Sequence, residues 1–222
     1  DGVWSNKGGM WAKMAGGPPD SVQVLLEAEG ALYAGAHRFG SDVWRYDGNS
    51  WSQMVGSPGA VYALYETGSV LYAGTDGNSV WAYDGVNWTQ IGGPATGVRV
   101  FVELNGILYA GTDTNSEGVW AYDINNVNWT QMSGSPSDVR ALIESGGMLF
   151  VGTDTGNNDL WMYDLNDEVW TSSPSIIMTL AEVEGTLLAG SNIGTNAVWA
   201  FDAGKNRWTL MTGSPSGSVD DL

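Results

Sequence analysis

The stretch LYAGTDGNSVWAYDGVNWTQ, residues 71–90, holds apolar runs separated by polar turns, and its pattern recurs along most of the 222-residue chain. Its opening motif returns as LYAGA, LYAGT, LYAGT, LFVGT and LLAGS at intervals of 37 to 41 residues. These motifs begin at Leu32, Leu71, Leu108, Leu149 and Leu187. A period in this range is typical of proteins built from one repeated structural unit, so the repeat decides the fold.

The tryptophans follow the same repeat. All twelve fall into pairs, and a turn such as Tyr-Asp-Gly separates most pairs. The pairs are Trp4/Trp11, Trp44/Trp51, Trp81/Trp88, Trp120/Trp129, Trp161/Trp170 and Trp199/Trp208. Asp-Gly between aromatic runs predicts a β-hairpin, because glycine tolerates positive φ and aspartate hydrogen-bonds its own backbone. Strict repetition favours a packing role for the indoles over a role as sugar-stacking platforms.

Each unit has room for four strands, which we call a to d in chain order. Strand a is an apolar run such as VYALYE at 61–66, and the LYAGT motif at 71–75 forms strand b. The tryptophan hairpin supplies strands c and d. All seven prolines lie in the connection from d to the next a, where a residue without an N–H breaks no ladder. No segment has a helical period.

Four short antiparallel strands repeated every ~40 residues predict an all-β fold, a β-propeller of four-stranded antiparallel blades. The VWAYDGVNWTQ hairpin at 80–90 and the LYAGT ending resemble kelch and Asp-box propellers, and the tryptophan content is similar in style to tachylectin-type lectin propellers. The sequence has Gly-Thr where kelch repeats have Gly-Gly, and its Asp and Gly are adjacent where an Asp-box separates them. The resemblance implies a lectin-like binding propeller.

We interpret residues 1–222 as a single propeller domain. Its complete repeat units run over 22–54, 61–91, 98–132, 139–172 and 177–211. Residues 1–14 form an extra c–d hairpin, and SVDDL at 218–222 matches the start of strand a. Joining these two segments predicts six blades with a split, incomplete last blade. A five-bladed ring with a separate hairpin is the alternative.

The composition excludes several classes of function. The net charge of −17, from 8 Lys and Arg against 25 Asp and Glu, opposes binding to nucleic acid. No apolar run is long enough to cross a bilayer, so we expect no membrane insertion. With no cysteine and one histidine, the chain has no disulfides and no multi-histidine metal site. An acidic, cysteine-free chain favours an extracellular or cell-surface bacterial setting, but an acidic cytoplasmic protein has the same composition, so the location stays open.

Candidate binding residues are sought where the units differ, because binding residues concentrate on loops held by a rigid frame. The b–c and d–a loops open on one face, and the second residue of strand a varies beside them. The candidates are His37, Tyr62, Asp76, Arg99, Asp113, Arg140, Asp154 and Asn192. Their hydroxyl, amide, carboxylate and guanidinium groups suit the polar surface of a glycan or a protein partner.

Asp113, Asn115 and Glu117 followed by Gly118 resemble the opening of a calcium loop. Counted from Asp113, the twelfth position is Ile124, which offers no carboxylate, so the calcium interpretation is weak and no other cofactor is expected. His37 is unique to the first b–c loop, where either an incidental surface role or a pH-sensitive ligand contact fits.

The sequence therefore predicts a non-catalytic binding module, with carbohydrate as the first ligand class. A protein–protein interaction propeller of a surface or secreted protein is the alternative, and a structural repeat protein without a ligand is the third interpretation. A glycosidase is less favoured, because it requires a singular pair of carboxylates and the acidic residues here mostly follow the repeat.

Overall fold

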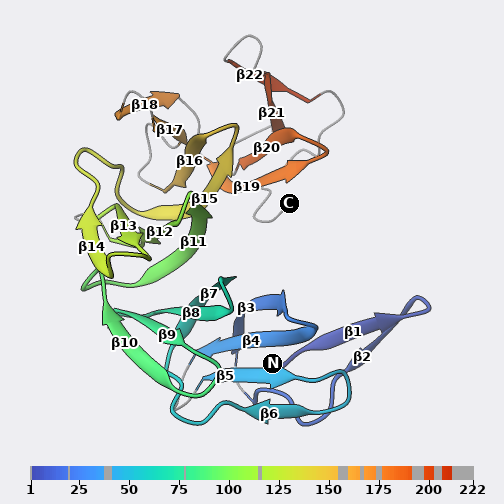
Figure 1. The fold of residues 1–222 in the computed structure, drawn as a ribbon. Helices are drawn as coiled ribbons and strands as arrows, with labels where there is room; N and C mark the ends of the chain where they lie inside the picture. The colour runs from blue at the N-terminus through green and yellow to red at the C-terminus, as the bar shows by residue number, and fades with distance from the viewer. Residues whose placement is uncertain are drawn as a thin grey trace. The chain divides into compact units, whose positions relative to one another are not determined.

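The computed structural model describes residues 2–19, 21–37, 42–77, 79–114, 117–154, 160–165, 168–173, 177–191, 198–202 and 207–211. In these residues every regular element is a β-strand, and the strands form five four-stranded antiparallel sheets and one two-stranded sheet (Figure 1). The chain divides into two compact units, residues 1–101 and 102–222, which are treated separately below. The predicted all-β fold with four-stranded antiparallel blades is confirmed.

The strands follow the repeat in order. The N-terminal hairpin consists of β1 (Trp4–Lys7) and β2 (Met10–Lys13). Blade 1 consists of β3 (Ser21–Ala28), β4 (Ala31–His37), β5 (Val43–Tyr46) and β6 (Trp51–Gln53). Blade 2 consists of β7 (Val61–Thr67), β8 (Val70–Thr75), β9 (Val80–Tyr83) and β10 (Trp88–Gly92). Within each blade, sequential strands are neighbours, as expected for a meander.

The remaining three blades have the same order. Blade 3 consists of β11 (Val98–Leu104), β12 (Ile107–Thr112), β13 (Val119–Asp123) and β14 (Asn128–Gln131). Blade 4 consists of β15 (Val139–Ser145), β16 (Met148–Thr153), β17 (Leu160–Asp164) and β18 (Val169–Ser173). Blade 5 consists of β19 (Ile177–Val183), β20 (Thr186–Ser191), β21 (Val198–Asp202) and β22 (Arg207–Leu210).

Strand b is the buried centre of each blade. In β8, all residues from Leu71 to Thr75 are buried, because the strand is hydrogen-bonded on both edges and covered on both faces. The glycine of the motif permits close approach of the next blade. A Cβ on Gly74 would lie 2.7 Å from Val98 Cγ1, and one on Gly35 would lie 2.7 Å from Val61 Cγ1. The small residue is therefore needed for blade packing rather than for ligand binding.

The repeated aromatic residues form cross-strand pairs at the start of strand d. Tyr46 pairs with Trp51 at a ring-centroid distance of 5.2 Å, and Tyr83 pairs with Trp88 at 5.1 Å. The equivalent pairs in the later blades are Tyr122/Trp129, Tyr163/Trp170 and Phe201/Trp208. Such pairs stabilise a sheet beyond the burial of their area, which agrees with a packing role for these tryptophans.

The repeated acidic residues cap turns. Glu66, Glu103 and Glu144 accept hydrogen bonds from backbone N–H groups of the a–b turns, at 2.9, 2.6 and 2.8 Å. Asp84 Oδ1 accepts from the N–H groups of Val86 and Asn87 in the c–d turn. These backbone hydrogen bonds lower the pKa of the Asp84 carboxyl, because they favour the ionised form. The repeated acidic residues described here therefore have a structural role, which is to hold the turns.

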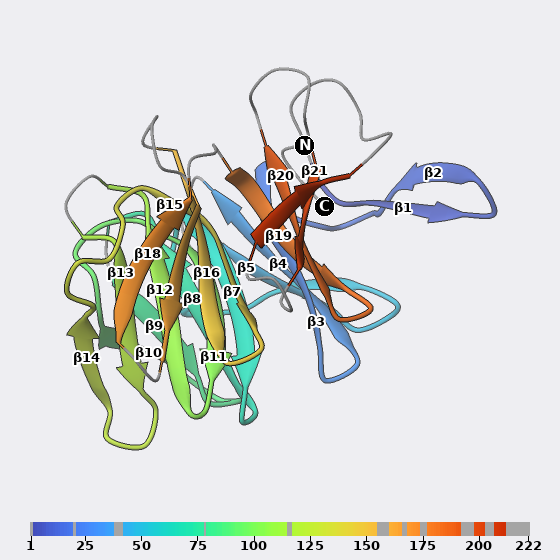
Figure 2. The ribbon, with the colours of Figure 1, turned by 90° about the horizontal axis from the view of Figure 1, so that it is seen from above.

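Among the described residues, the base of the N-terminal hairpin packs against blade 1. Val3 is buried with Ala34 and Trp51 of blade 1, and Met14 packs against the same cluster. Trp4 and Trp11 are 53% and 70% exposed, so these two indoles are not packed between sheets in the described residues. Figure 2 shows the hairpin projecting from blade 1. The strand expected to join it, at 218–222, lies outside the described residues.

Candidate functional site

The variable second residue of strand a lies on a β-bulge. The register of β7 against β8 shifts between Val61 and Ala63, and that of β15 against β16 shifts between Val139 and Ala141. Tyr62 and Arg140 are the residues inside these shifts. Equivalent register shifts occur in blades 1 and 5, where Gln23 and Met178 are the residues inside the shift. A bulge adds a residue with no partner across the ladder and redirects its side chain, which frees this position to vary.

In unit 1, four of the predicted residues come together. The guanidinium carbon of Arg99 lies 3.6 Å from the centroid of the Tyr62 ring, which is cation–π geometry. The His37 ring centroid is 4.9 Å from that of Tyr62. His37 Nε2 lies 3.8 Å from Asp76 Oδ2. The cluster joins residues of blades 1, 2 and 3.

A cleft of about 400 Å³ lies beside this cluster. Its described walls come from the d–a loop before blade 2 and from blade 2 itself. They are Pro58, Gly59, Ala60, Thr75, Asp76, Trp81 and Gln90. Asp76 and Gln90 are exposed, whereas Trp81 is half-buried and also packs against the core between blades 1 and 2. The cleft thus combines an aromatic ring, a carboxylate and a carboxamide.

Local hydrogen bonds hold the loop that carries Asp76. The hydroxyl of buried Thr75 donates to the carbonyl of Ser79 at 2.9 Å, so this threonine serves the loop rather than a ligand. The N–H of Asp76 donates to the carbonyl of Ala60 at 3.0 Å, which joins the b–c loop to the d–a loop. The Asp76 carboxylate is therefore presented from a fixed backbone.

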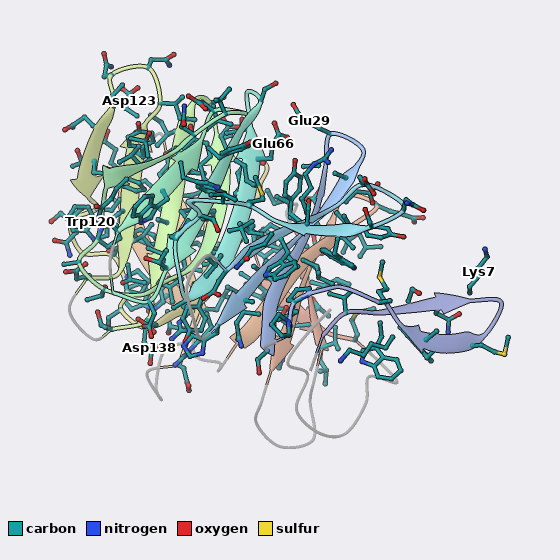
Figure 3. All side chains as sticks on the ribbon, turned by 90° about the horizontal axis from the view of Figure 1, so that it is seen from below. Lys7, Glu29, Glu66, Trp120, Asp123 and Asp138 are labelled. Atoms are coloured by element: carbon teal, nitrogen blue, oxygen red, sulfur yellow. The ribbon has the colours of Figure 1, made fainter. Side chains whose placement is uncertain are left out.

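In unit 2, Arg140 is tied to two aspartates. Its Nη2 lies 3.0 Å from Asp138 Oδ1 and 3.7 Å from Asp154 Oδ2. The structure therefore brings the predicted residues Arg140 and Asp154 together directly, and it adds Asp138, which sequence reasoning missed. The available signal was its place at the end of the d–a loop, directly before the strand that carries Arg140. Figure 3 labels Asp138 at the end opposite the c–d turn that carries Asp123.

A second cleft of about 470 Å³ lies in unit 2 and is lined mainly by polar residues. Its walls are Glu117, Gly118, Gln131, Met132, Ser133, Gly134, Ser135 and Ser137. The Gln131 amide donates to the carbonyl of Glu117 at 2.8 Å. Gln90 and Gln131 occupy the same place in their repeats, and the sequence argument overlooked both because it treated the repeated Trp-Thr-Gln as scaffold.

Gly118, the glycine of the weak calcium-loop interpretation, is explained by packing instead. Gly118 has φ of +63°, and a Cβ there would lie 2.5 Å from Ser135 Oγ and 2.6 Å from the carbonyl oxygen of Pro136. Glycine is thus required by the approach of the d–a loop. Asn115 and Asn192 lie outside the described residues. Within the described residues, no group of three or more His, Cys, Asp or Glu side chains is placed to hold a metal ion.

Comparison with known proteins identifies the fold class. No family model and no curated protein matches the sequence. A chain of the mitotic checkpoint complex is similar in structure, with a TM-score of 0.77 and 17% identity, covering 98% of this chain and 75% of that chain. The computationally designed Ika8 protein has a TM-score of 0.70 and 17% identity, covering 94% and 67%.

The extracellular domain of a hybrid two-component system from B. thetaiotaomicron has a TM-score of 0.76 and 16% identity, covering 99% of this chain. This chain spans 33% of that domain's length. At these identities the likeness concerns the fold alone. Together with the five four-stranded sheets, it places the protein in the β-propeller class. No helix among the described residues is long and apolar enough to span a membrane.

Proposed function

We propose that this propeller is a non-catalytic carbohydrate-binding module and that the cleft around Asp76, Trp81 and Gln90 is its ligand site. The observation that carries this proposal is the combination of an indole, a carboxylate and a carboxamide in one cleft of about 400 Å³. Binding sites of this size generally have apolar walls with a few placed polar groups.

The chemistry of the cleft matches a sugar ring. A carboxylate accepts hydrogen bonds from hydroxyl groups, and a carboxamide both donates and accepts them. The exposed part of the Trp81 ring offers an apolar surface to the C–H face of a pyranose. The neighbouring cluster of His37, Tyr62 and Arg99 extends the polar surface toward blade 3.

The proposal assigns no catalysis to this cleft. Asp76 is the one carboxylate among its described lining residues, whereas glycoside hydrolysis generally requires a pair of carboxylates on either side of the scissile bond. Incubation with aryl glycosides therefore should release no free phenol. Turnover that disappears in Asp76→Asn would contradict the non-catalytic assignment.

Glycan-array screening followed by calorimetry tests the ligand class. We expect saturable binding of a neutral oligosaccharide, and Asp76→Ala and Gln90→Ala each should weaken it by about tenfold or more, because each removes a hydrogen-bonding partner from the site. Asp113→Ala is the matched control, since Asp113 occupies the place of Asp76 in blade 3 but does not line the cleft. Absence of saccharide binding across the array would contradict the proposal.

A protein partner is the second candidate, favoured by the net charge of −17. Such a charge attracts a basic surface and speeds its association, an effect that falls as salt screens it. Pull-down with basic bait proteins at low and raised salt separates the two candidates, because sugar binding through neutral hydroxyl groups has little salt dependence. An extracellular or cell-surface location suits both candidates, and the structurally similar B. thetaiotaomicron protein is an extracellular domain.

A further inference from the structure

Asp42 is a buried acidic residue that lies next to the ligand cleft of unit 1 but does not line it. It is 3% exposed and directly precedes β5. Its backbone N–H donates to the carbonyl of Pro58 at 3.0 Å, and its Oδ2 accepts from the N–H of Ala60 at 2.7 Å. The second bond is at the short end of N–H···O distances, as expected for a charged acceptor. Asp42 therefore bonds both ends of the loop segment 58–60, which forms one wall of the cleft.

Ala60 connects the buried Asp42 to the ligand-binding carboxylate of Asp76. It has a φ of +50°, a left-handed conformation that a residue other than glycine keeps only where its surroundings hold it. In this conformation its N–H is bonded to Asp42, and its carbonyl accepts from the N–H of Asp76 at 3.0 Å. Asp76 is a wall of the same cleft. The chain of two hydrogen bonds therefore joins a buried group of blade 1 to a binding group of blade 2.

The equivalent loop of unit 2 is held by a backbone acceptor instead of a carboxylate. There the residue before strand a of blade 4 is Asp138, with a φ of +53°. Its N–H donates to the carbonyl of Thr114 at 3.2 Å. Gly118 occupies the place of Asp42 in blade 3, and Asp159, at this place in blade 4, lies outside the described residues. The fold thus closes this connection without a buried carboxylate, so Asp42 has a local role beside the cleft.

We propose that Asp42 is a positioning residue of the ligand cleft, which fixes the wall at 58–60 and, through Ala60, the carboxylate of Asp76. This inference rests on the carbohydrate-binding function proposed above. Asp42 makes no contact with the ligand in this role and acts through the groups that do. A site whose polar groups are already in place loses less conformational entropy when a ligand binds, so the buried carboxylate raises affinity through preorganisation.

Calorimetry with a saccharide identified on the glycan array tests the effect on affinity. Asp42→Ala should weaken binding by about tenfold, because the wall and Asp76 are no longer held in place. Asp42→Asn should restore most of the affinity, since the asparagine Oδ1 accepts the same hydrogen bond. Ser135→Ala is the matched control: it removes the acceptor of the Val119 N–H in unit 2, and it should lower stability but leave affinity unchanged.

Amide hydrogen exchange measured by NMR tests the same role without a ligand. The amides of Ala60 and Asp76 should be protected in the wild-type protein, because both are hydrogen-bonded. In Asp42→Ala both should exchange faster. The amide of Met54, which is bonded to the carbonyl of Val43, is the local control and should keep its protection, whereas a general loss of stability would expose all three amides.

The two measurements separate the failure of this inference from the failure of the proposed function. Equal saccharide affinity of the wild-type protein and Asp42→Ala would overturn the positioning role and leave the carbohydrate-binding function in place. A wild-type protein that binds no saccharide would contradict the function, and the exchange data then decide: unchanged protection of the Ala60 and Asp76 amides in Asp42→Ala would overturn the positioning role. Fast exchange of the Ala60 amide in the wild-type protein would overturn it without any variant.

Discussion

At the scale of single residues, the repeat is explained by steric and turn requirements rather than by chemistry at a site. The glycine of strand b meets the first valine of the next strand a, as Gly74 meets Val98. Asp47, Asp84 and Asp123 accept backbone hydrogen bonds that close the c–d turns of blades 1 to 3. These roles recur because each blade has the same strand order and packs against its neighbour in the same way.

Gly74→Ala tests the close approach of blades. The added Cβ would lie 2.7 Å from Val98 Cγ1 and 3.0 Å from the Val98 carbonyl oxygen, so we expect a loss of about 1–3 kcal/mol in the free energy of unfolding. Urea denaturation measures it. The double variant Gly74→Ala/Val98→Ala should cost less than the sum of the two single changes, because removing the valine methyls makes room. Strict additivity would show that the two positions do not touch.

The turn aspartates predict a dependence of stability on pH. Backbone hydrogen bonds lower the pKa of Asp47 and Asp84, and the Asn126 side chain and backbone lower that of Asp123. A carboxyl whose pKa is lower in the folded than in the unfolded chain stabilises the fold above the unfolded pKa, and this stabilisation is lost as the pH falls through the folded pKa. Stability should therefore fall as the pH drops below about 4.

Urea titrations across this range, compared with the triple variant Asp47→Asn/Asp84→Asn/Asp123→Asn, measure the effect. Asparagine keeps the turn-forming acceptor but does not titrate, so the variant should lose less stability on acidification. Parallel pH profiles for the two proteins would show that these carboxylates do not contribute.

At the scale of elements, the d–a loop is fastened to strand c of the blade it leaves. Ser57 Oγ accepts from the N–H of Val43 at 3.2 Å, and Ser135 Oγ accepts from the N–H of Val119 at 3.0 Å. Both serines belong to a Gly-Ser-Pro loop. Because Val43 is fully buried, its N–H has no access to water, and the loop is held in the position that forms the cleft wall at Pro58.

Ser57→Ala should lower the free energy of unfolding by about 1–3 kcal/mol, since it leaves the buried Val43 N–H without its acceptor. Thermal and urea unfolding measure the change. Ser133→Ala is the control, because Ser133 lies in the corresponding connection after blade 3 and is exposed. Equal effects of the two substitutions would argue against the fastening role of Ser57.

At the scale of the whole molecule, the excess of acidic over basic residues is the most prominent feature. A net charge of −17 on 222 residues keeps the protein soluble but opposes the folded state through self-repulsion. Part of this charge comes from the repeat, because acidic side chains that accept backbone hydrogen bonds in turns recur from blade to blade. These are Asp47, Glu66, Asp84, Glu103, Asp123 and Glu144.

Raising the ionic strength from about 0.01 M to about 0.15 M shortens the Debye length from about 30 Å to about 8 Å, which weakens this repulsion. The melting temperature should therefore rise with sodium chloride over this range. A sucrose series at matched osmolality is the control for solute exclusion. A fall of the melting temperature with salt would show that attractive ion pairs, such as Arg140 with Asp138, outweigh the repulsion.

The sequence by itself determined the repeat, the four-stranded unit, the turn chemistry and the loops on which candidate residues lie, because these depend on local periodicity and on glycine, proline and aspartate. It also predicted His37, Tyr62, Asp76 and Arg99 as candidates on one face. Only the tertiary structure decided that they touch, that the variable residue lies on a β-bulge, and that Trp81 and Gln90 share a cleft with Asp76. Contacts between blades join residues far apart in the chain, and no local pattern records which of them meet.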